Sequence, residues 1–341
     1  MRAMILKEFR QLRRDRRTLA MMIAMPVLLL VILGYAASFD VSSIPTAVAG
    51  PDAAAVTATL PKSFHIVATN PKPDSAWAQA ELRDGHAGIA IIGAGARPLV
   101  YLDGSQLFTA QAAQRALAGA RADSATGTAS VRVLYNPELK TSYVMIPGLA
   151  GVILVFVGTV ITSLGVVRER QAGTLEQLAV MPLRPADVFL GKIVPYFAVA
   201  LADLAIVLAV GTAIFGVPFN GSVAVFALGA LLFVFVTLGL GVLISSVSQT
   251  QGQAIQLAIM TLLPQVLMSG LIFPLSSIVA GVRWIAYLLP LTYFTEISRG
   301  VMLRAQPIAS LWAPFTYLAL LGAAVTVLAT LRFRAFLAPA R

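Results

Sequence analysis

The chain has 341 residues, of which 58% are hydrophobic and only 12% are charged, and its formal net charge is +10. This composition excludes an ordinary soluble domain, and the lack of cysteine excludes disulfides, thiol catalysis and cysteine-ligated metals. The sequence therefore predicts a membrane protein with several spans, whose basic residues flank the membrane and attract anionic lipid rather than nucleic acid.

Residues 1–17 predict a cytoplasmic interfacial helix. Ile5, Phe9 and Leu12 share one helical face, and the segment holds seven Lys or Arg against two acids. The apolar run over residues 18–38 predicts the first transmembrane helix. A cleaved signal peptide is the alternative, but the span-length apolar run and the long basic region favour an uncleaved span.

Residues 39–143 predict a small extracytoplasmic α/β domain between the first and second spans. They hold eight basic and eight acidic residues, and about 100 residues suffice to bury a core. His65 and His86 are the only histidines of the chain. They could form a metal site with Asp84, but the spacing of these residues favours ordinary surface histidines, so no metal is expected. Two helix-like stretches, "DSAWAQAELRDG" and "FTAQAAQRALAGARAD", separate five β-rich runs: "IPTAVAG", "FHIVAT", "AGIAII", "PLVYL" and "VRVLY".

Residues 144–331 predict a five-span transmembrane domain, which makes an all-α bundle of six transmembrane helices with the first span. An even number of spans returns both termini to the cytoplasm, in agreement with the basic N-terminus and the basic tail over residues 332–341. Pro264 is expected to kink the fifth span. The second to sixth spans are predicted at residues 144–167, 193–215, 222–246, 254–273 and 311–331.

Residues 274–307 are too polar for a lipid-facing span and too apolar for a free loop. We expect two short re-entrant or interfacial helices that are split near Leu289 and Pro290. The alternative is an amphipathic surface loop, but Trp284 and Tyr287 favour a position at a membrane interface.

Three charged residues are candidates for lining or gating a pathway. Asp203 is the lone acid within the third predicted span, where a carboxylate costs on the order of 3 kcal/mol. Structural hydrogen bonding, pathway lining and a proton relay are its alternative roles. Glu296 and Arg299 lie three residues apart on one helical face, so they are expected either to form a local ion pair or to gate the outer mouth.

The insert over residues 168–192 predicts a short cytoplasmic helix between two spans. Thr174 and Gln177 fit a capping box, Pro182 ends the helix, and Pro185 begins the next one. Such a helix has about two turns, roughly 12 Å, and is too short to be stable without docking on another surface. That surface is either the protein's own inner face or a cytoplasmic partner.

The insert resembles the signature of type 2 ATP-binding-cassette transporter permeases, approximately E-R-E-x-G-T-x-E-x-L followed by Pro and then G-K. Gln171 stands where that family usually has an acid. The resemblance continues in "YNPELKTSYVMIPGLAGVIL", "SGLIFPLSSI" and "LLPLTYFTEISRGVML". The matching residues of the insert are Glu169, Arg170, Gly173, Thr174, Glu176, Leu178, Pro182, Gly191 and Lys192.

The resemblance implies a coupling helix that inserts into a groove of a separate ATPase subunit. It also implies a homodimer or heterodimer of permease subunits in the bacterial inner membrane, export of drugs or other amphiphiles, and in some members a periplasmic adaptor. ATP and magnesium would bind the ATPase, so no cofactor is expected in this chain. The candidate coupling residues are Glu169, Arg170, Gly173, Thr174, Glu176, Gln177 and Arg184.

The chain itself is not expected to be an enzyme. It lacks the G-x-x-x-x-G-K-[ST] phosphate loop, since Ile193 follows Gly191 and Lys192. An ion-gradient-driven secondary transporter that uses Asp203 is the alternative function, although no second intramembrane charge partner is evident. A membrane-anchored sensor is a third class, but it needs a longer cytoplasmic segment than the sequence provides.

Overall fold

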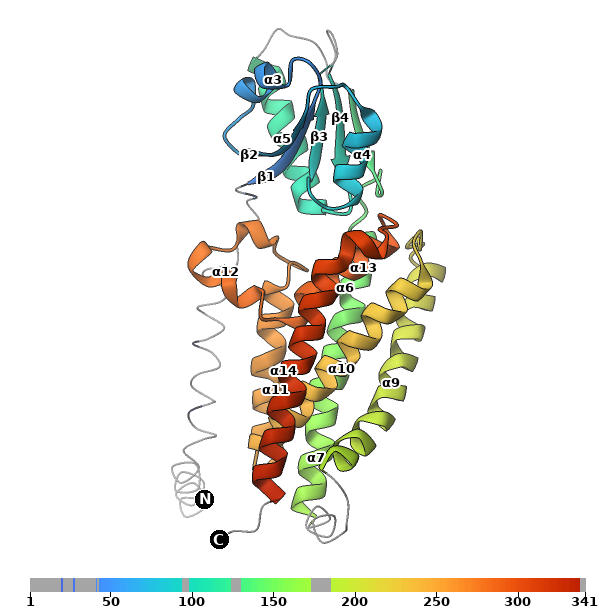
Figure 1. Ribbon diagram of the computed structural model, residues 1–341, viewed down its shortest axis with the longest axis vertical. Helices are drawn as coiled ribbons and strands as arrows, with labels where there is room; N and C mark the ends of the chain where they lie inside the picture. The colour runs from blue at the N-terminus through green and yellow to red at the C-terminus, as the bar shows by residue number, and fades with distance from the viewer. Residues whose placement is uncertain are drawn as a thin grey trace, which may run out of the picture.

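The computed structural model describes residues 43–93, 98–123, 130–172 and 185–337, together with residues 20, 27 and 41. Within these residues, an α/β domain stands on one end of a bundle of long helices (Figure 1). The predicted interfacial helix, most of the first predicted span, and the predicted coupling helix lie outside the described residues.

A five-stranded mixed sheet forms the centre of the α/β domain, with strand order β2-β1-β3-β4-β5. Strand β1 is parallel to both β2 and β3, whereas β4 is antiparallel to β3 and parallel to β5. Each strand coincides with one of the five β-rich runs in the sequence. The strands are β1 (Ile44–Ala49), β2 (Phe64–Asn70), β3 (Ile89–Ile92), β4 (Leu99–Asp103) and β5 (Ser130–Leu134).

Helices cover both faces of this sheet. Ile89 and Ile91 of β3 pack with α3 (Ala53–Thr59) and α5 (Leu107–Asp123), whereas Ala90 and Ile92 belong to the cluster around α4 (Ser75–Arg83). Alternate residues of a strand point to opposite faces, so a strand that is buried on both sides is apolar throughout. This explains the uninterrupted "IAII" of β3.

The helical bundle is built from long apolar helices. Helices α6 (Thr141–Val155) and α7 (Thr162–Gln171) are joined by a π-helical turn, η1 (Phe156–Ile161), into one rod. The other long helices are α9 (Pro185–Ala213), α10 (Val223–Val247), α11 (Gln251–Met268) and α14 (Trp312–Leu337).

Four segments of the described chain are long and apolar enough to cross a membrane: Thr141–Glu169, Val194–Ala213, Val223–Val247 and Ile308–Arg332. The fifth predicted span corresponds to α11, which is not among them. Four glutamines, at positions 251, 253, 256 and 265, make α11 more polar than the others. It also ends at Met268 rather than at residue 273, because Ser269 caps it and Gly270 adopts a positive φ of 80°.

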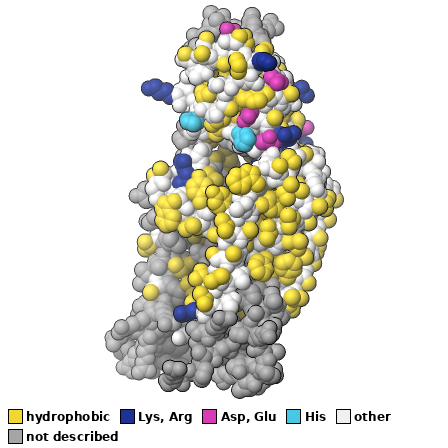
Figure 2. Space-filling view, viewed as in Figure 1, with side chains coloured by type: hydrophobic (Ala, Val, Ile, Leu, Met, Phe, Trp, Pro, Cys, Tyr) yellow, Lys and Arg dark blue, Asp and Glu magenta, His cyan; other side chains and the backbone are white. Residues whose placement is uncertain are grey.

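Close helix packing holds the bundle together around α10. A Cβ atom on Gly241 of α10 would collide with the carbonyl oxygen of Gly158 in η1. Phe233 of α10 stacks on Phe294, with ring centroids 4.4 Å apart. On the described surface, hydrophobic side chains cover the bundle, whereas charged side chains gather on the α/β domain and where it meets the bundle (Figure 2).

The segment over residues 274–307 folds into two short helices, α12 (Ala280–Ala286) and α13 (Pro290–Met302), between the 3-10 turns η2 (Leu275–Ser277) and η3 (Ile308–Leu311). The break lies at Leu289 and Pro290, as the sequence predicts. Leu289 is extended because a residue before proline avoids the helical region, and Pro290 opens α13. Trp284 and Tyr287 are exposed, at 60% and 49%.

Candidate functional site at the domain junction

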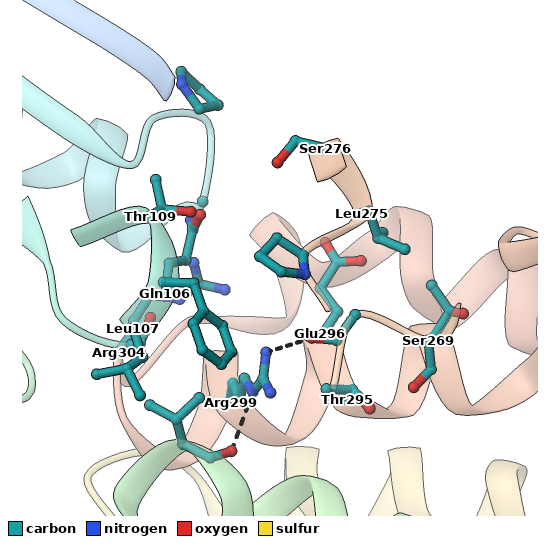
Figure 3. A pocket seen from close by; sticks show the side chains of 18 residues that line it. Gln106, Leu107, Thr109, Ser269, Leu275, Ser276, Thr295, Glu296, Arg299 and Arg304 are labelled. Atoms are coloured by element: carbon teal, nitrogen blue, oxygen red, sulfur yellow. Dashed lines mark hydrogen bonds between the residues drawn. The ribbon is translucent and has the colours of Figure 1, made fainter. Parts of the chain in front are cut away.

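A cavity of about 320 Å³ lies where the α/β domain meets the helical bundle. We call it the junction cavity. Figure 3 shows Gln106, Leu107 and Thr109 on one side of it and Ser269 and Leu275 on the opposite side, with Glu296 between them. The start of α5, the C-terminal end of α11, the turn η2 and the helix α13 therefore all contribute to its wall.

Glu296 and Arg299 both line the junction cavity, but they do not form the ion pair that their spacing led us to expect. No salt bridge or hydrogen bond joins them within the described residues. Instead, Arg299 donates to three backbone carbonyls: those of Val144 at 3.3 Å, Gly270 at 3.1 Å and Leu271 at 3.2 Å.

The physical reason lies at the end of α11. The last carbonyls of a helix and those just beyond it lack intrahelical donors, and a buried carbonyl without a donor is costly. Gly270 and Leu271 directly follow Ser269, the C-cap of α11, and their carbonyl oxygens accept hydrogen bonds from the Arg299 guanidinium. The sequence could not predict this arrangement, because the acceptors are 28 or more residues away.

A buried ion pair joins the two parts of the molecule beside the cavity. Arg304, just after α13, lies 3.3 Å from the carboxylate of Asp103 at the end of β4, and their side chains are 7% and 0% exposed. The Asp103 carboxylate also accepts hydrogen bonds from the backbone and hydroxyl of Ser105, at 2.9 and 2.6 Å, and from Gln106 at 3.2 Å. No sequence pattern indicates this pair, because its two residues are 201 positions apart.

A second polar link joins Asp84, after α4, to Ser310 in η3. The Ser310 hydroxyl donates to the Asp84 carboxylate at 3.0 Å, and Arg83 donates to it at 2.9 Å. Burial by itself raises the pKa of the Asp84 carboxyl, but the hydrogen bonds from Arg83 and Ser310, together with the positive charge of Arg83, leave the pKa below its ordinary value.

These contacts also bear on the alternative of a two-histidine metal site. Asp84 is engaged by Arg83 and Ser310, and the Nδ1 atom of His86 lies 3.1 Å from the carboxylate of Glu81. No metal-binding group of three His, Cys, Asp or Glu is formed within the described ranges.

Asn136 fixes the connection between β5 and α6. Its side-chain amide donates to the carbonyls of Gly104 and Lys140, at 3.3 and 3.0 Å, and its oxygen accepts from the Lys140 backbone at 2.9 Å. The long rod of α6, η1 and α7 therefore starts at a fixed point on the α/β domain.

Asp203 lies in the middle of α9, far along the chain from the junction residues, and is half-buried. Neither a hydrogen bond nor an ion pair joins it to another described residue. Its neighbours Val199 and Ile206 are 52% and 60% exposed. The segment Val194–Ala213 of α9 thus presents a largely unburied apolar surface with one acid in it.

Two of the candidate coupling residues, Glu169 and Arg170, lie in the last turn of α7. Gly173, Thr174, Glu176, Gln177 and Arg184 lie outside the described residues. Beside the last turn, Gln251 at the start of α11 donates to the side-chain oxygen of Gln171 at 2.9 Å. Helix α9 then begins at Pro185, where the sequence predicts a helix start.

Comparison with known proteins places this architecture in context. Residues 16–331 match the family described as "ABC-2 family transporter protein". The "Probable multidrug ABC transporter permease YbhS" of Escherichia coli (strain K12) is 30% identical over 334 residues, which cover 89% of each chain.

Two further relatives match over shorter stretches. The "Probable multidrug ABC transporter permease YbhR" of the same organism is 35% identical over 182 residues, so the match spans about half of each protein, 53% of this chain and 50% of YbhR. The "ABC transporter G family member 20" of Dictyostelium discoideum is 29% identical over 177 residues, which cover 24% of its length.

Proposed function

The chain belongs to the ABC-2 family of transporter proteins, and from this membership we propose that it is the permease subunit of an ATP-driven exporter. The observation that carries the proposal is the family match over residues 16–331, together with 30% identity to YbhS across most of both chains. ABC-2 permeases work with an ATPase subunit, so ATP hydrolysis is assigned to a separate protein that binds ATP and magnesium.

We assign the contact with that ATPase to the segment between α7 and α9. The rod that ends there runs over Thr141–Gln171, about 46 Å at 1.5 Å per residue. Because Asn136 holds its other end on the α/β domain, a push on the segment would move the rod as a lever. Glu169, Arg170, Gly173, Thr174, Glu176, Gln177 and Arg184 are the proposed coupling residues.

We place the chain in the inner membrane of a bacterial cell. In the proposed orientation the α/β domain lies in the periplasm and both termini lie in the cytoplasm. The balanced charge of residues 39–143 and the basic residues near both ends support it. Six spans, with the first over residues 18–38, and a dimer with an identical or related second permease belong to the same proposal. An adaptor protein would dock on the α/β domain.

The proposed substrates are drug-like or amphiphilic molecules that leave the cytoplasm or the inner leaflet. The printed names of YbhR and YbhS as probable multidrug permeases support this class. In this orientation the junction cavity lies on the periplasmic side, so Glu296 and Arg299 are placed at the exit of the pathway rather than at its entrance.

The decisive experiment is reconstitution with the cognate ATPase. The purified chain should hydrolyse no ATP alone, should co-purify with the ATPase, and should transport only when both are present. Glu169→Lys should weaken the association at least tenfold. Glu138→Lys, which makes the same change on an exposed glutamate of the α/β domain, should leave the association unchanged.

A second measurement does not depend on the stability of a variant. A photo-crosslinking residue at Gln177 should capture the ATPase, whereas one at Gln79 in α4 should not. If Gln177 captures only lipid and the same chain while the chain transports without an ATPase, the proposed function is wrong.

A further inference from the structure

We propose that the junction cavity binds the protonated amine of an amphiphilic ligand, with Glu296 as its counter-ion. This inference deepens the proposed function by naming a ligand class, and it rests on that function only for the step in which the bound molecule is released. The binding itself involves this chain alone.

The first observation is the position of Glu296. It is the only exposed residue of α13; the other members of Pro290–Met302 are buried, except Arg299, which is half-buried. Glu296 is also the only acidic residue in the cavity wall. Its carboxylate has neither a hydrogen bond nor an ion pair with any residue that the structure describes, so it is available to a ligand.

The second observation is that the two cations of the wall are already engaged. Arg299 donates to the carbonyls of Val144, Gly270 and Leu271. The Nη1 atom of Arg304 donates to Asp103 and its Nη2 atom donates to Gln306, at 3.3 and 3.2 Å. The Glu296 carboxylate is therefore the charged group of the wall without a hydrogen-bond partner among the described residues, and its negative charge attracts a cation.

The third observation is a set of buried polar atoms without partners. Ser269 and Thr295 line the cavity and are each 2% exposed, and neither hydroxyl oxygen has a hydrogen-bond partner within the described residues. Buried polar groups are normally satisfied, so such atoms indicate a missing partner. A hydroxyl accepts from an ammonium N–H, as does a carboxylate.

The Nε atom of Arg304 is also buried and unpartnered among the described residues. As an N–H donor it suits a hydroxyl, ether or carbonyl oxygen on the ligand. An amine that also carries a neutral oxygen acceptor is therefore expected to bind more tightly than a simple amine.

The rest of the wall determines the remaining part of the ligand. Leu107, Phe108, Pro274 and Leu275 supply apolar surface. The volume of about 320 Å³ falls at the lower end of the range for small-molecule sites, about 300–1,000 Å³. An alkyl or aryl group of moderate size fits this space beside the amine.

The test compares three probes with one carbon skeleton, phenylbutylamine, phenylbutanol and phenylbutyrate, which present an ammonium, a hydroxyl and a carboxylate at neutral pH. They are titrated calorimetrically into the full chain in lipid nanodiscs, and the heat from empty nanodiscs is subtracted. We expect the amine to saturate one site per chain and to bind at least tenfold more tightly than the alcohol. The carboxylate should not bind.

Variants then assign the site. Glu296→Gln should weaken amine binding at least tenfold and leave alcohol binding unchanged, whereas Glu296→Asp should retain a preference for the amine. Glu138→Gln makes the same change on an exposed glutamate and should have no effect. Unchanged gel-filtration profiles and melting temperatures establish that each variant is folded.

Three results overturn the inference: equal binding of amine and alcohol, undiminished amine binding by folded Glu296→Gln, or no saturable binding by any probe. Because the titration contains no ATPase, a failed ATPase association leaves this result intact. Conversely, absent amine binding leaves the permease assignment intact.

Discussion

Asp103 and Arg304 are 201 residues apart in the chain, yet they meet as a buried ion pair with 3.3 Å between carboxylate and guanidinium. One residue belongs to the α/β domain and the other follows α13 of the bundle. With the Asp84–Ser310 hydrogen bond and the Asn136 contacts, the pair fixes the domain on the bundle at three points. A displacement of α13 is therefore expected to move the domain with it.

We predict that Arg304→Met lowers the free energy of unfolding by about 3–5 kcal/mol, because it leaves the buried Asp103 carboxylate without its cation. Arg83→Met is the matched control. It breaks the Arg83–Asp84 pair, whose side chains are 46% and 20% exposed, and an exposed pair contributes only about 0–1 kcal/mol. Chemical denaturation of both variants gives the comparison, and equal losses would contradict the assigned role of burial.

The second prediction concerns the contact between Gly241 and Gly158. Gly241→Ala places a Cβ atom against the Gly158 carbonyl, so α10 and η1 must separate. Overpacking of this kind lowers the free energy of unfolding by about 1–3 kcal/mol. Gly281→Ala is the control, because nothing lies within 4 Å of its Cβ position.

Gly281 lies in helix α12, so Gly281→Ala should leave the free energy of unfolding unchanged or raise it by up to about 1 kcal/mol. Thermal unfolding in one detergent measures both variants. A Gly241→Ala protein as stable as Gly281→Ala would show that the helices do not pack as closely as described.

The sequence predicts the five strands of the α/β domain and its helices α4 and α5, but it does not predict the short helix α3. Strands β1 to β5 are short apolar runs bounded by turn residues. Helix α4 begins after Asp74, whose carboxylate accepts hydrogen bonds from the backbone N–H groups of Ala76 and Trp77 at 2.8 and 3.1 Å. These signals are local. The break at Leu289 and Pro290 is local as well, since it follows from the proline ring.

The contacts of the site could not be predicted, because they join distant parts of the chain. The spacing of Glu296 and Arg299 indicated an ion pair, but three carbonyls from α6 and the end of α11 compete for the guanidinium. The apolar run "LIF" predicts that the fifth span continues to residue 273, whereas Gly270 ends the helix with its positive φ. In the first case tertiary contacts decided between locally reasonable alternatives, whereas in the second the glycine after Ser269 is a local helix-end signal.

The third prediction is an alkaline loss of stability due to Tyr135. Burial, and then the nearby Asp103 carboxylate, raise the pKa of this phenol from 10.0 to about 12. The phenol has a higher pKa in the folded state than in the unfolded state, so its contribution to the stability of the folded state is fully present below pH 10. This contribution is lost as the pH rises from 10 toward 12, because the phenol ionises first in the unfolded state.

Tyr135→Phe should therefore reduce the fall in melting temperature between pH 10 and about 12. The difference between the ultraviolet titrations of wild type and variant should give the phenol's own midpoint near pH 12. A midpoint near 10 would show that the surroundings of Tyr135 do not raise the pKa of its phenol.

The fourth prediction separates the permease function from gradient-driven transport. Asp203 is the single acid within Val194–Ala213, the apolar part of α9, it is half-buried, and no described residue pairs with it. A proton relay needs a carboxyl that titrates, so Asp203→Asn would abolish transport driven by a pH gradient. In the ATP-driven permease proposed here, asparagine keeps the hydrogen-bonding capacity of the site, and removing a charge from an apolar helix does not impair insertion.

We therefore expect Asp203→Asn to retain at least half of the ATP-driven transport rate in proteoliposomes that contain the cognate ATPase, and to show no dependence on an imposed pH gradient. Asp203→Leu also removes the hydrogen-bonding atoms, so comparison of the two variants shows whether polarity at this position matters. Transport by the wild-type chain that follows the pH gradient without ATP, and that disappears in Asp203→Asn, would instead establish Asp203 as a proton-carrying residue.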